Sequence, residues 1–215
     1  MNYCLNIEEL FHDMDFYDKF QAAKEAGYDY VEFWAWYGRD LEKIKAQCDK
    51  YGVTITGFKG DWDWSLCDNK TAEEFIEWTK KSIETAKFLG CDSLIVHSNS
   101  IVDEGSSNVN DVYSPQRQVA NITSSLMRVA PLLEENGVKM YVEPLNNLDH
   151  LAGMFLVNAR VTADIIRAVD SPNVKMLCDL FHMQIMHGDL TNSMLENLDI
   201  MDYIHIAEAP DRGQP

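Results

Sequence analysis

The chain has 215 residues, with 18 Lys and Arg against 35 Asp and Glu, a net charge of −17 and a pI near 4.6. Because 46% of the residues are hydrophobic and 25% are charged, the composition is globular and excludes the apolar-poor class of disordered chains. The acidity argues against a nucleic-acid partner, since such binding draws its affinity from clustered Lys and Arg. The length suits one domain with a substantial core.

The amino-terminal residues lack the basic and apolar regions of a signal peptide, and no window approaches the roughly 18 apolar residues of a membrane span. The five cysteines are scattered, odd in number and free of C-x-x-C pairs, which favours reduced thiols over a disulfide framework. We therefore expect a soluble, cytoplasmic protein without a membrane partner.

Short apolar runs alternate with longer helical patterns along the chain, which is typical of repeated βα units around a parallel sheet. Their continuous apolar character fits strands that are buried on both faces. The fold class predicted is therefore α/β. Seven strands are predicted, at residues 3–7, 30–35, 54–59, 93–97, 139–143, 174–179 and 203–207.

Helices are predicted between these strands from their cap residues. Two long helices are expected to end before Gly90 and Gly137, which suit the left-handed position after a helix. The segment 71–74, Thr-Ala-Glu-Glu, predicts a capping box at the start of the first of them. That helix carries a stripe at spacings of three and four that we expect to face the sheet, formed by Phe75, Trp78, Thr79, Ser82, Ile83, Ala86 and Leu89.

Polar residues at strand ends are the first candidates for chemistry, because reactive side chains of parallel α/β folds lie at the carboxyl ends of strands. Glu143, Asp179 and His205 hold this position on three successive predicted strands. Singly, each would more often be a helix cap or an ion-pair partner. Together, two carboxylates and an imidazole form a ligand set for a borderline-to-hard divalent cation.

The same rule selects Lys59 and His97 near strand ends as candidate substrate contacts, with His182 and Arg212 a few residues downstream. His97 is equally compatible with a structural histidine. Aromatic residues after the second and third strands either wall the mouth or pack under long loops: Trp34, Trp36, Tyr37, Trp62 and Trp64, with Asp61 nearby. Neither a G-x-S-x-G elbow nor a phosphate-binding glycine loop occurs, so a serine nucleophile and a nucleotide cofactor are not expected.

Three segments carry a family resemblance: 141–149 (Tyr-Val-Glu-Pro-Leu-Asn-Asn-Leu-Asp), 178–190 (beginning Cys-Asp-Leu-Phe-His) and 205–215 (beginning His-Ile-Ala-Glu-Ala-Pro). They resemble the hydroxypyruvate isomerase group of the xylose isomerase-like sugar isomerases and epimerases. The resemblance runs through essentially the whole chain and implies a metal-dependent TIM (β/α)₈-type barrel, formed as a single domain by residues 1–215.

The resemblance also implies roles for individual residues. Glu143 looks like a metal ligand that also serves as acid and base, and Asp179 looks like the second ligand. His205 is the third, at a position where hydroxypyruvate isomerases often have glutamine and ketose 3-epimerases have histidine. His182 and Arg212 match positions that bind substrate oxygens. One imidazole among carboxylates makes Mn²⁺ the expected ion, with Mg²⁺ or Co²⁺ as alternatives.

In the sugar isomerases and epimerases that the sequence resembles, an eighth strand supplies a second catalytic glutamate, which is also the fourth metal ligand. That strand is not in this sequence, so we expect a barrel truncated after its seventh strand with a three-ligand metal site. Glu208 is the first candidate for local compensation.

The leading hypothesis is a metal-dependent isomerase or epimerase that moves a proton on a small sugar or hydroxy-ketone through an enediolate. A ketose 3-epimerase is the alternative within the same family. A non-catalytic or partner-completed barrel subunit is a second alternative, and metal-dependent phosphodiester cleavage, against which the acidity argues, is a third. The expected partner is the small substrate, and a homo-oligomer is left open.

Overall fold

A computed structural model describes residues 2–62, 64–101, 112–148 and 151–214. Seven parallel strands form one sheet in chain order, as expected of consecutive βα units. The strands are β1 (Cys4–Asn6), β2 (Tyr30–Phe33), β3 (Thr54–Lys59), β4 (Ser93–Val96), β5 (Lys139–Val142), β6 (Val174–Asp179) and β7 (Met201–His205). The predicted α/β class is confirmed, and β3 and β6 have the predicted bounds.

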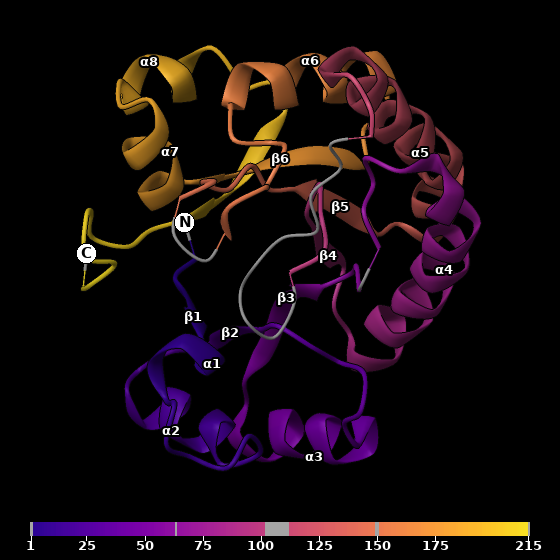
Figure 1. The fold of residues 1–215 in the computed structure, drawn as a ribbon. Coiled ribbons are helices and arrows are strands. Elements are labelled where there is room, and N and C mark those ends of the chain that lie inside the picture. Colours follow the sequence, from indigo (N-terminus) through magenta and orange to yellow (C-terminus); the bar gives the residue numbers. More distant parts are fainter. Residues whose placement is uncertain (1, 63, 102–111, 149–150, 215) are drawn as a thin grey trace.

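Helices connect the strands and lie outside the sheet (Figure 1). They are α1 (Ile7–Leu10), α2 (Lys19–Glu25), α3 (Leu41–Tyr51), α4 (Ala72–Leu89), α5 (Pro115–Asn136), α6 (Ala159–Val169), α7 (Leu180–Met186) and α8 (Leu190–Leu195), with a short 3₁₀ turn η1 (Asn69–Thr71) before α4. Among the residues that the structure describes, no helix has both the length and the apolar character needed to cross a bilayer.

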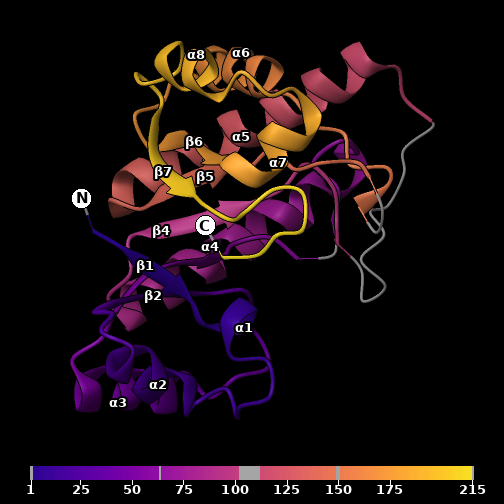
Figure 2. The same ribbon diagram turned by 90° about the vertical axis from the view of Figure 1, so that its left-hand side faces the viewer.

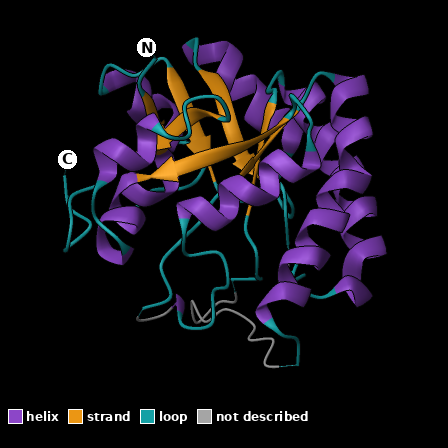
Figure 3. Cartoon of the chain, turned by 90° about the horizontal axis from the view of Figure 1, so that it is seen from above, coloured by secondary structure: helices purple, strands orange, loops and turns teal. Residues whose placement is uncertain are grey.

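The sheet curls into an open half-barrel of the TIM type, surrounded by its helices when seen from above (Figure 3). β1 and β7 are its edges. Side chains from the two ends of the sheet nevertheless make contact inside the curl. The Tyr203 hydroxyl of β7 donates a hydrogen bond to Glu32 Oε2 of β2 at 2.6 Å. The same hydroxyl lies 3.0 Å from Thr56 Oγ1 of β3. Side chains of β7 therefore cross the interior to reach the first strands.

Apolar side chains pack against both faces of the sheet. The largest cluster lies between the sheet and its helices and includes the predicted stripe of α4, in which Phe75 is 1% and Ala86 0% exposed. A smaller cluster lies inside the curl and consists of Ile95, Leu177 and Tyr141, with Tyr203 packed against them. The stripe prediction is confirmed by these burials.

The helix ends follow their sequence signals with one exception. Gly90 and Gly137 end α4 and α5 in the left-handed region, at φ of 73° and 65°. The predicted capping box at Thr71 is wrong, because its hydroxyl donates to the Ser65 and Asp68 carbonyls and accepts no helix N–H. The preceding turn is instead capped by the Asp68 carboxylate, which accepts from Lys70 N–H at 3.0 Å.

The segment after β7 runs between α7 and α1 (Figure 2). Arg212 in this segment lies 3.4 Å from Glu9 of α1, measured from Nη2 to Oε1. β7 begins and ends two residues before the predicted 203–207, so His205 is its last residue. This shift brings His205 into line with the ends of β5 and β6.

Candidate metal and substrate site

Three neighbouring strands deliver polar side chains to one mouth of the half-barrel. Glu143 directly follows β5, Asp179 is the last residue of β6, and His205 is the last residue of β7. Glu143 and Asp179 are 5% and 2% exposed. Two neighbouring carboxylates lose solvation free energy on burial and repel each other unless positive charge compensates them.

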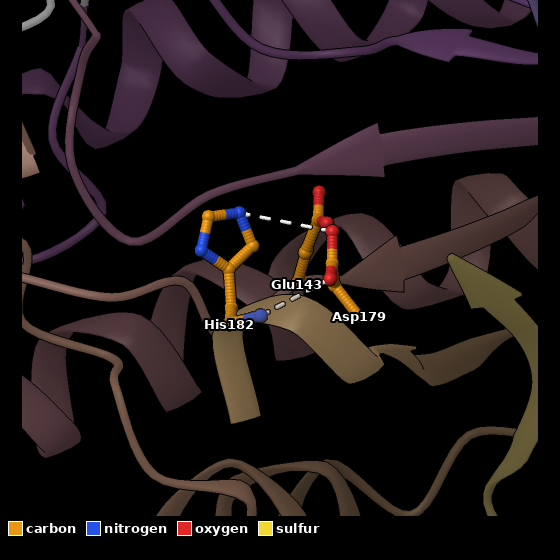
Figure 4. Close-up of side chains that lie close together, drawn as sticks. All are labelled: Glu143, Asp179 and His182. Carbon is orange, nitrogen blue, oxygen red and sulfur yellow. Dashed lines mark hydrogen bonds and ion pairs between the residues drawn. The ribbon is translucent and has the colours of Figure 1, made fainter. Parts of the chain in front are cut away.

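Asp179 has one oxygen committed to the backbone and one turned toward the site. Its Oδ1 caps α7 by accepting from the N–H groups of Phe181 and His182 at 2.8 and 3.1 Å. Its Oδ2 lies 3.7 Å from His182 Nε2. The cap fixes the carboxylate so that Oδ2 faces Glu143 and His182 (Figure 4).

Glu143, Asp179 and His182 form a buried group that could hold a metal ion, since one ligand atom of each lies within 4.8 Å of the others. His205 also approaches both carboxylates, with Nδ1 3.1 Å from Glu143 Oε1 and 3.9 Å from Asp179 Oδ2. Adjacent ligands of an octahedral cation with bonds of about 2.1 Å are about 3 Å apart, so these spacings suit such an ion. The donor chemistry, two carboxylates with imidazole, suits it as well.

The ring of His182 has a defined orientation. Its Nδ1 accepts the Asn146 backbone N–H at 3.3 Å and lies 2.9 Å from Asn146 Nδ2. A nitrogen that accepts a backbone N–H carries no proton, so the proton of the neutral ring is on Nε2. His182 therefore presents an N–H donor toward Asp179 and the mouth.

His97 lies behind Glu143 and is 8% exposed. Its Nε2 is 3.1 Å from Glu143 Oε2, and its Nδ1 is 3.0 Å from Asp61 Oδ2. Lys59 Nζ lies 3.6 Å from Asp61 Oδ1. Lys59 and His97, both expected to contact substrate, thus belong to a chain of alternating charges that ends on Glu143.

Charge pairing decides the protonation of this chain. Burial would raise the pKa of Glu143, but the neighbouring His205 and His97 outweigh it and hold that pKa well below its usual range. Burial would likewise lower the pKa of His97, but Asp61 and Glu143 raise it to about 9. For His205, Glu32 and Glu143 together overcome burial and raise the pKa well above its usual value.

Asp179 and His182 have the opposite behaviour, because burial prevails. Burial and the neighbouring charge of Glu143 raise the pKa of Asp179 to about 6. Burial lowers the pKa of His182 to about 4, so the ring is neutral at pH 7. Without a cation, protonated His97 and His205 therefore compensate the buried negative charge of the site.

The remaining predicted contacts lie at the rim. Arg212 Cζ is 5.3 Å from the Phe181 ring centroid. Its positive charge acts to lower the pKa of both Asp179 and His182. Trp34 is 47% exposed, and its backbone N–H donates to Glu8 Oε2 at 2.7 Å.

Glu208 is exposed, and its backbone N–H donates to the Gly213 carbonyl at 3.1 Å. Its Oε2 lies where a Cβ on Gly213 would be 2.6 Å away. Of the interactions described for Glu208, none joins it to the carboxylates of the mouth.

Aromatic residues after β2 and β3 pack against the core, against one another or beside α4. Trp36 packs against the core, and its Nε1 donates to Ser82 Oγ at 3.2 Å. Trp62 stacks on Tyr37 with ring centroids 4.2 Å apart. Trp62 and Trp64 line a surface hollow together with Trp78 and Lys81 of α4.

Sequence reasoning missed Glu32, which lies 3.0 Å from His205 Nε2. It also left the role of Asp61 unassigned. The signal for Glu32 was a charged residue inside an apolar strand, between Val31 and Phe33. Because those neighbours pack toward the helices, alternation along the strand turns Glu32 into the interior of the curl.

Residues 20–215 match the model of a family described as the xylose isomerase-like TIM barrel. The chain belongs to the xylose isomerase-like TIM barrel family. Members of this family support the resemblance drawn from the strand-end motifs. The chain is 28% identical to a hydroxypyruvate isomerase of Escherichia coli (strain K12) over 222 residues, which cover 100% of this chain and 83% of that protein.

Two further family comparisons extend this result. The chain is 28% identical to a 2-oxo-tetronate isomerase of Haemophilus influenzae, with 99% of this chain and 82% of that protein covered. A solved structure described as an AP endonuclease, family 2, from Brucella melitensis is 25% identical and superposes with a TM-score of 0.90, covering 100% of this chain and 83% of that one. This xylose isomerase-like chain is therefore hydroxypyruvate isomerase-like in sequence.

The arrangement can hold a divalent cation against two buried carboxylates and present N–H donors to a small polar molecule. The Glu143 carboxylate, fixed on both oxygens by histidines, can exchange a proton with a bound substrate.

Proposed function

We propose that this chain is a metal-dependent isomerase of a small hydroxy-ketone or sugar acid, with hydroxypyruvate as the first substrate to test. The observation that carries the proposal is the buried Glu143 carboxylate at the end of β5, with Asp179 Oδ2 and His205 Nδ1 turned toward the same position. The relatives described as hydroxypyruvate and 2-oxo-tetronate isomerases support this substrate class.

We assign Glu143, Asp179 and His205 as the residues that hold the ion, with Mn²⁺ as the first candidate. The assignment prefers His205 to His182 because His182 Nδ1 accepts the Asn146 N–H. The proton on its Nε2 then blocks that nitrogen as a ligand. A divalent cation bound there would polarise the substrate carbonyl and stabilise the negative charge of an enediolate.

Glu143 is the group that moves the proton in this proposal. As the hydroxyl proton passes to the carbonyl oxygen, isomerisation requires removal of a proton from the hydroxyl-bearing carbon and its return to the former carbonyl carbon. One carboxylate on one face of the substrate can do both, while His97 holds its second oxygen in place. His182 and Arg212 donate hydrogen bonds to the substrate oxygens and keep the reacting carbons in register. Epimerisation would instead need a second acid–base group on the opposite face.

The test measures conversion of hydroxypyruvate to its aldehyde isomer, 2-hydroxy-3-oxopropanoate, by the full chain with Mn²⁺ in D₂O. Deuterium incorporation beside the carbonyl reports the proton transfer. Glu143→Gln should abolish conversion and deuterium exchange while leaving the circular dichroism spectrum unchanged. Glu196→Gln, at an exposed glutamate directly after α8, is the matched control and should convert substrate like the wild type. Unchanged turnover in Glu143→Gln would contradict the proposal.

A parallel assay with ketoses tests the epimerase alternative. His205 supports that alternative, since ketose 3-epimerases of the resembled group have histidine at its position. Inversion of a ketose at the carbon beside its carbonyl, without conversion of hydroxypyruvate, would move the assignment to epimerisation. The likeness to a structure described as an AP endonuclease adds DNA carrying an abasic site to the substrates assayed. No cleavage is expected, because the chain has a net charge of −17.

A further inference from the structure

A buried carboxylate faces the ring nitrogen of His205 that does not face Glu143. Glu32 lies in β2 and is 3% exposed. In the order of the sheet β2 is far from β7, yet the curl brings Glu32 Oε2 to 3.0 Å from His205 Nε2. The His205 ring therefore lies between two carboxylates, with Glu32 on Nε2 and Glu143 on Nδ1.

The start of α1 fixes which atoms around Glu32 are donors. Asn6 caps this helix, and its Oδ1 accepts the backbone N–H groups of Glu8 and Glu9, both at 3.1 Å. The amide orientation is thereby set, because two backbone donors require the oxygen at that position. The Asn6 Nδ2 group must then be the one that faces Glu32 Oε1, to which it donates at 3.0 Å.

The second oxygen of Glu32 is also an acceptor. It accepts the Tyr203 hydroxyl at 2.6 Å and lies within hydrogen-bond distance of His205 Nε2. With donors on both of its oxygens, Glu32 accepts from every partner and has no proton to offer. The His205 ring must therefore carry a proton on Nε2 to complete this contact.

A proton on Nε2 determines what the other nitrogen can do. A neutral imidazole that binds a cation through Nδ1 keeps its one ring proton on Nε2, where a buried carboxylate commonly accepts it. We propose that Glu32 is a positioning residue that orients the His205 ring and holds its proton on Nε2, so that Nδ1 faces a cation at Glu143 and Asp179. This inference rests on the proposed metal site and adds a residue on which its affinity depends.

Metal affinity of the full chain tests this role without reference to turnover. Isothermal titration with Mn²⁺ should show binding to the wild type and about 10- to 100-fold weaker binding to Glu32→Gln. The amide cannot satisfy the site, because its NH₂ group must face either the Asn6 donor or the donors of Tyr203 and His205. In the His205→Ala background, Glu32→Gln should cause no further loss.

Several outcomes would overturn the inference. Wild-type affinity in Glu32→Gln would do so, as would an equal loss of affinity in the presence and absence of His205. A wild-type chain that binds no Mn²⁺ would instead overturn the proposed metal site itself. Tyr203→Phe is the matched control, because it removes another donor to the same oxygen and leaves the His205 contact, so its loss should be much smaller.

A spectroscopic measurement separates this role from a general effect on folding. With Zn²⁺ bound, the ¹⁵N shifts of the His205 ring should show a protonated Nε2 in the wild type. Glu32→Asp retains the charge but withdraws the carboxylate, and it replaces Glu32→Gln if that variant does not fold. A protonated Nδ1 in the Zn²⁺-bound wild type would overturn the inference whatever the affinities.

Discussion

His97 Nε2 lies 3.1 Å from Glu143 Oε2, and both side chains are buried. The other ring nitrogen of His97 lies 3.0 Å from Asp61 Oδ2, which also accepts the His97 backbone N–H at 2.6 Å. One imidazole therefore joins two buried carboxylates from the ends of β3 and β5. This relation makes His97 part of the support of Glu143.

Removal of this ring should strongly destabilise the fold. His97→Ala leaves Asp61 and Glu143 buried with one partner fewer each, and loss of one partner of a buried ion pair costs about 3–5 kcal/mol. Urea unfolding at pH 7 measures the difference. His12→Ala, at an exposed histidine, is the control and should change the free energy of unfolding by no more than about 0.5 kcal/mol. Similar values for the two variants would show that the chain of charges contributes nothing.

The backbone beneath Asp61 provides a second test of packing near the site. A Cβ on Gly60 would lie 2.8 Å from Leu94 Cβ, so Gly60→Ala must displace β4 or the loop that carries Asp61. We expect a loss of about 1–3 kcal/mol in unfolding free energy, as for other overpacked positions. Gly57→Ala is the matched control in the same strand region, because its nearest neighbour, Tyr203 Oη, would be 3.5 Å away. Equal stability of the two variants would contradict the expected close approach.

The buried cysteines should be unreactive in the folded chain. Burial raises the pKa of Cys67 and Cys91 to about 12 and that of Cys178 to about 11. Since the thiolate is the reactive form, labelling by a disulfide reagent at pH 8 should be slow and should accelerate as pH rises. Because folding holds these thiols neutral, their ionisation favours the unfolded chain, and stability should fall as pH rises above about 9.

Thiol counting checks this expectation. In urea at pH 8, all five cysteines of the sequence should react rapidly, whereas the folded chain should leave the three buried ones unlabelled. Mass spectrometry after alkylation identifies which residues carry the label. Rapid labelling of Cys91 in the folded chain would contradict its burial between α4 and β4.

The strand-end residues could be predicted because the signals for them are local. An apolar run marks a strand, and the next polar residue lies at the mouth, which correctly located Glu143, Asp179 and His205. Glu32 could not be assigned in this way, because its partner His205 is 173 positions away and meets it only through the curl of the sheet. The capping box at Thr71 was wrong for a local reason, since the hydroxyl bonds instead to carbonyls three and six residues earlier in the chain.

The two histidines nearest Asp179 should differ in what their removal changes. His205 Nδ1 faces both carboxylates, so His205→Ala should weaken Mn²⁺ binding by more than about tenfold. His182 presents Nε2–H, so His182→Ala should raise the KM for the substrate and leave Mn²⁺ affinity close to that of the wild type. Titration of Mn²⁺ into each variant, followed by steady-state kinetics at saturating Mn²⁺, separates the two effects.

The reverse pattern would exchange the two roles. If His182→Ala lost the ion and His205→Ala kept it, the ligand set would be the buried group of Glu143, Asp179 and His182. The Asn146 N–H would then have to release Nδ1, because a ring bound through Nε2 carries its proton on Nδ1. Asn146→Ala cannot test this point, since the backbone N–H remains. The affinities of the two histidine variants therefore decide the ligand set directly.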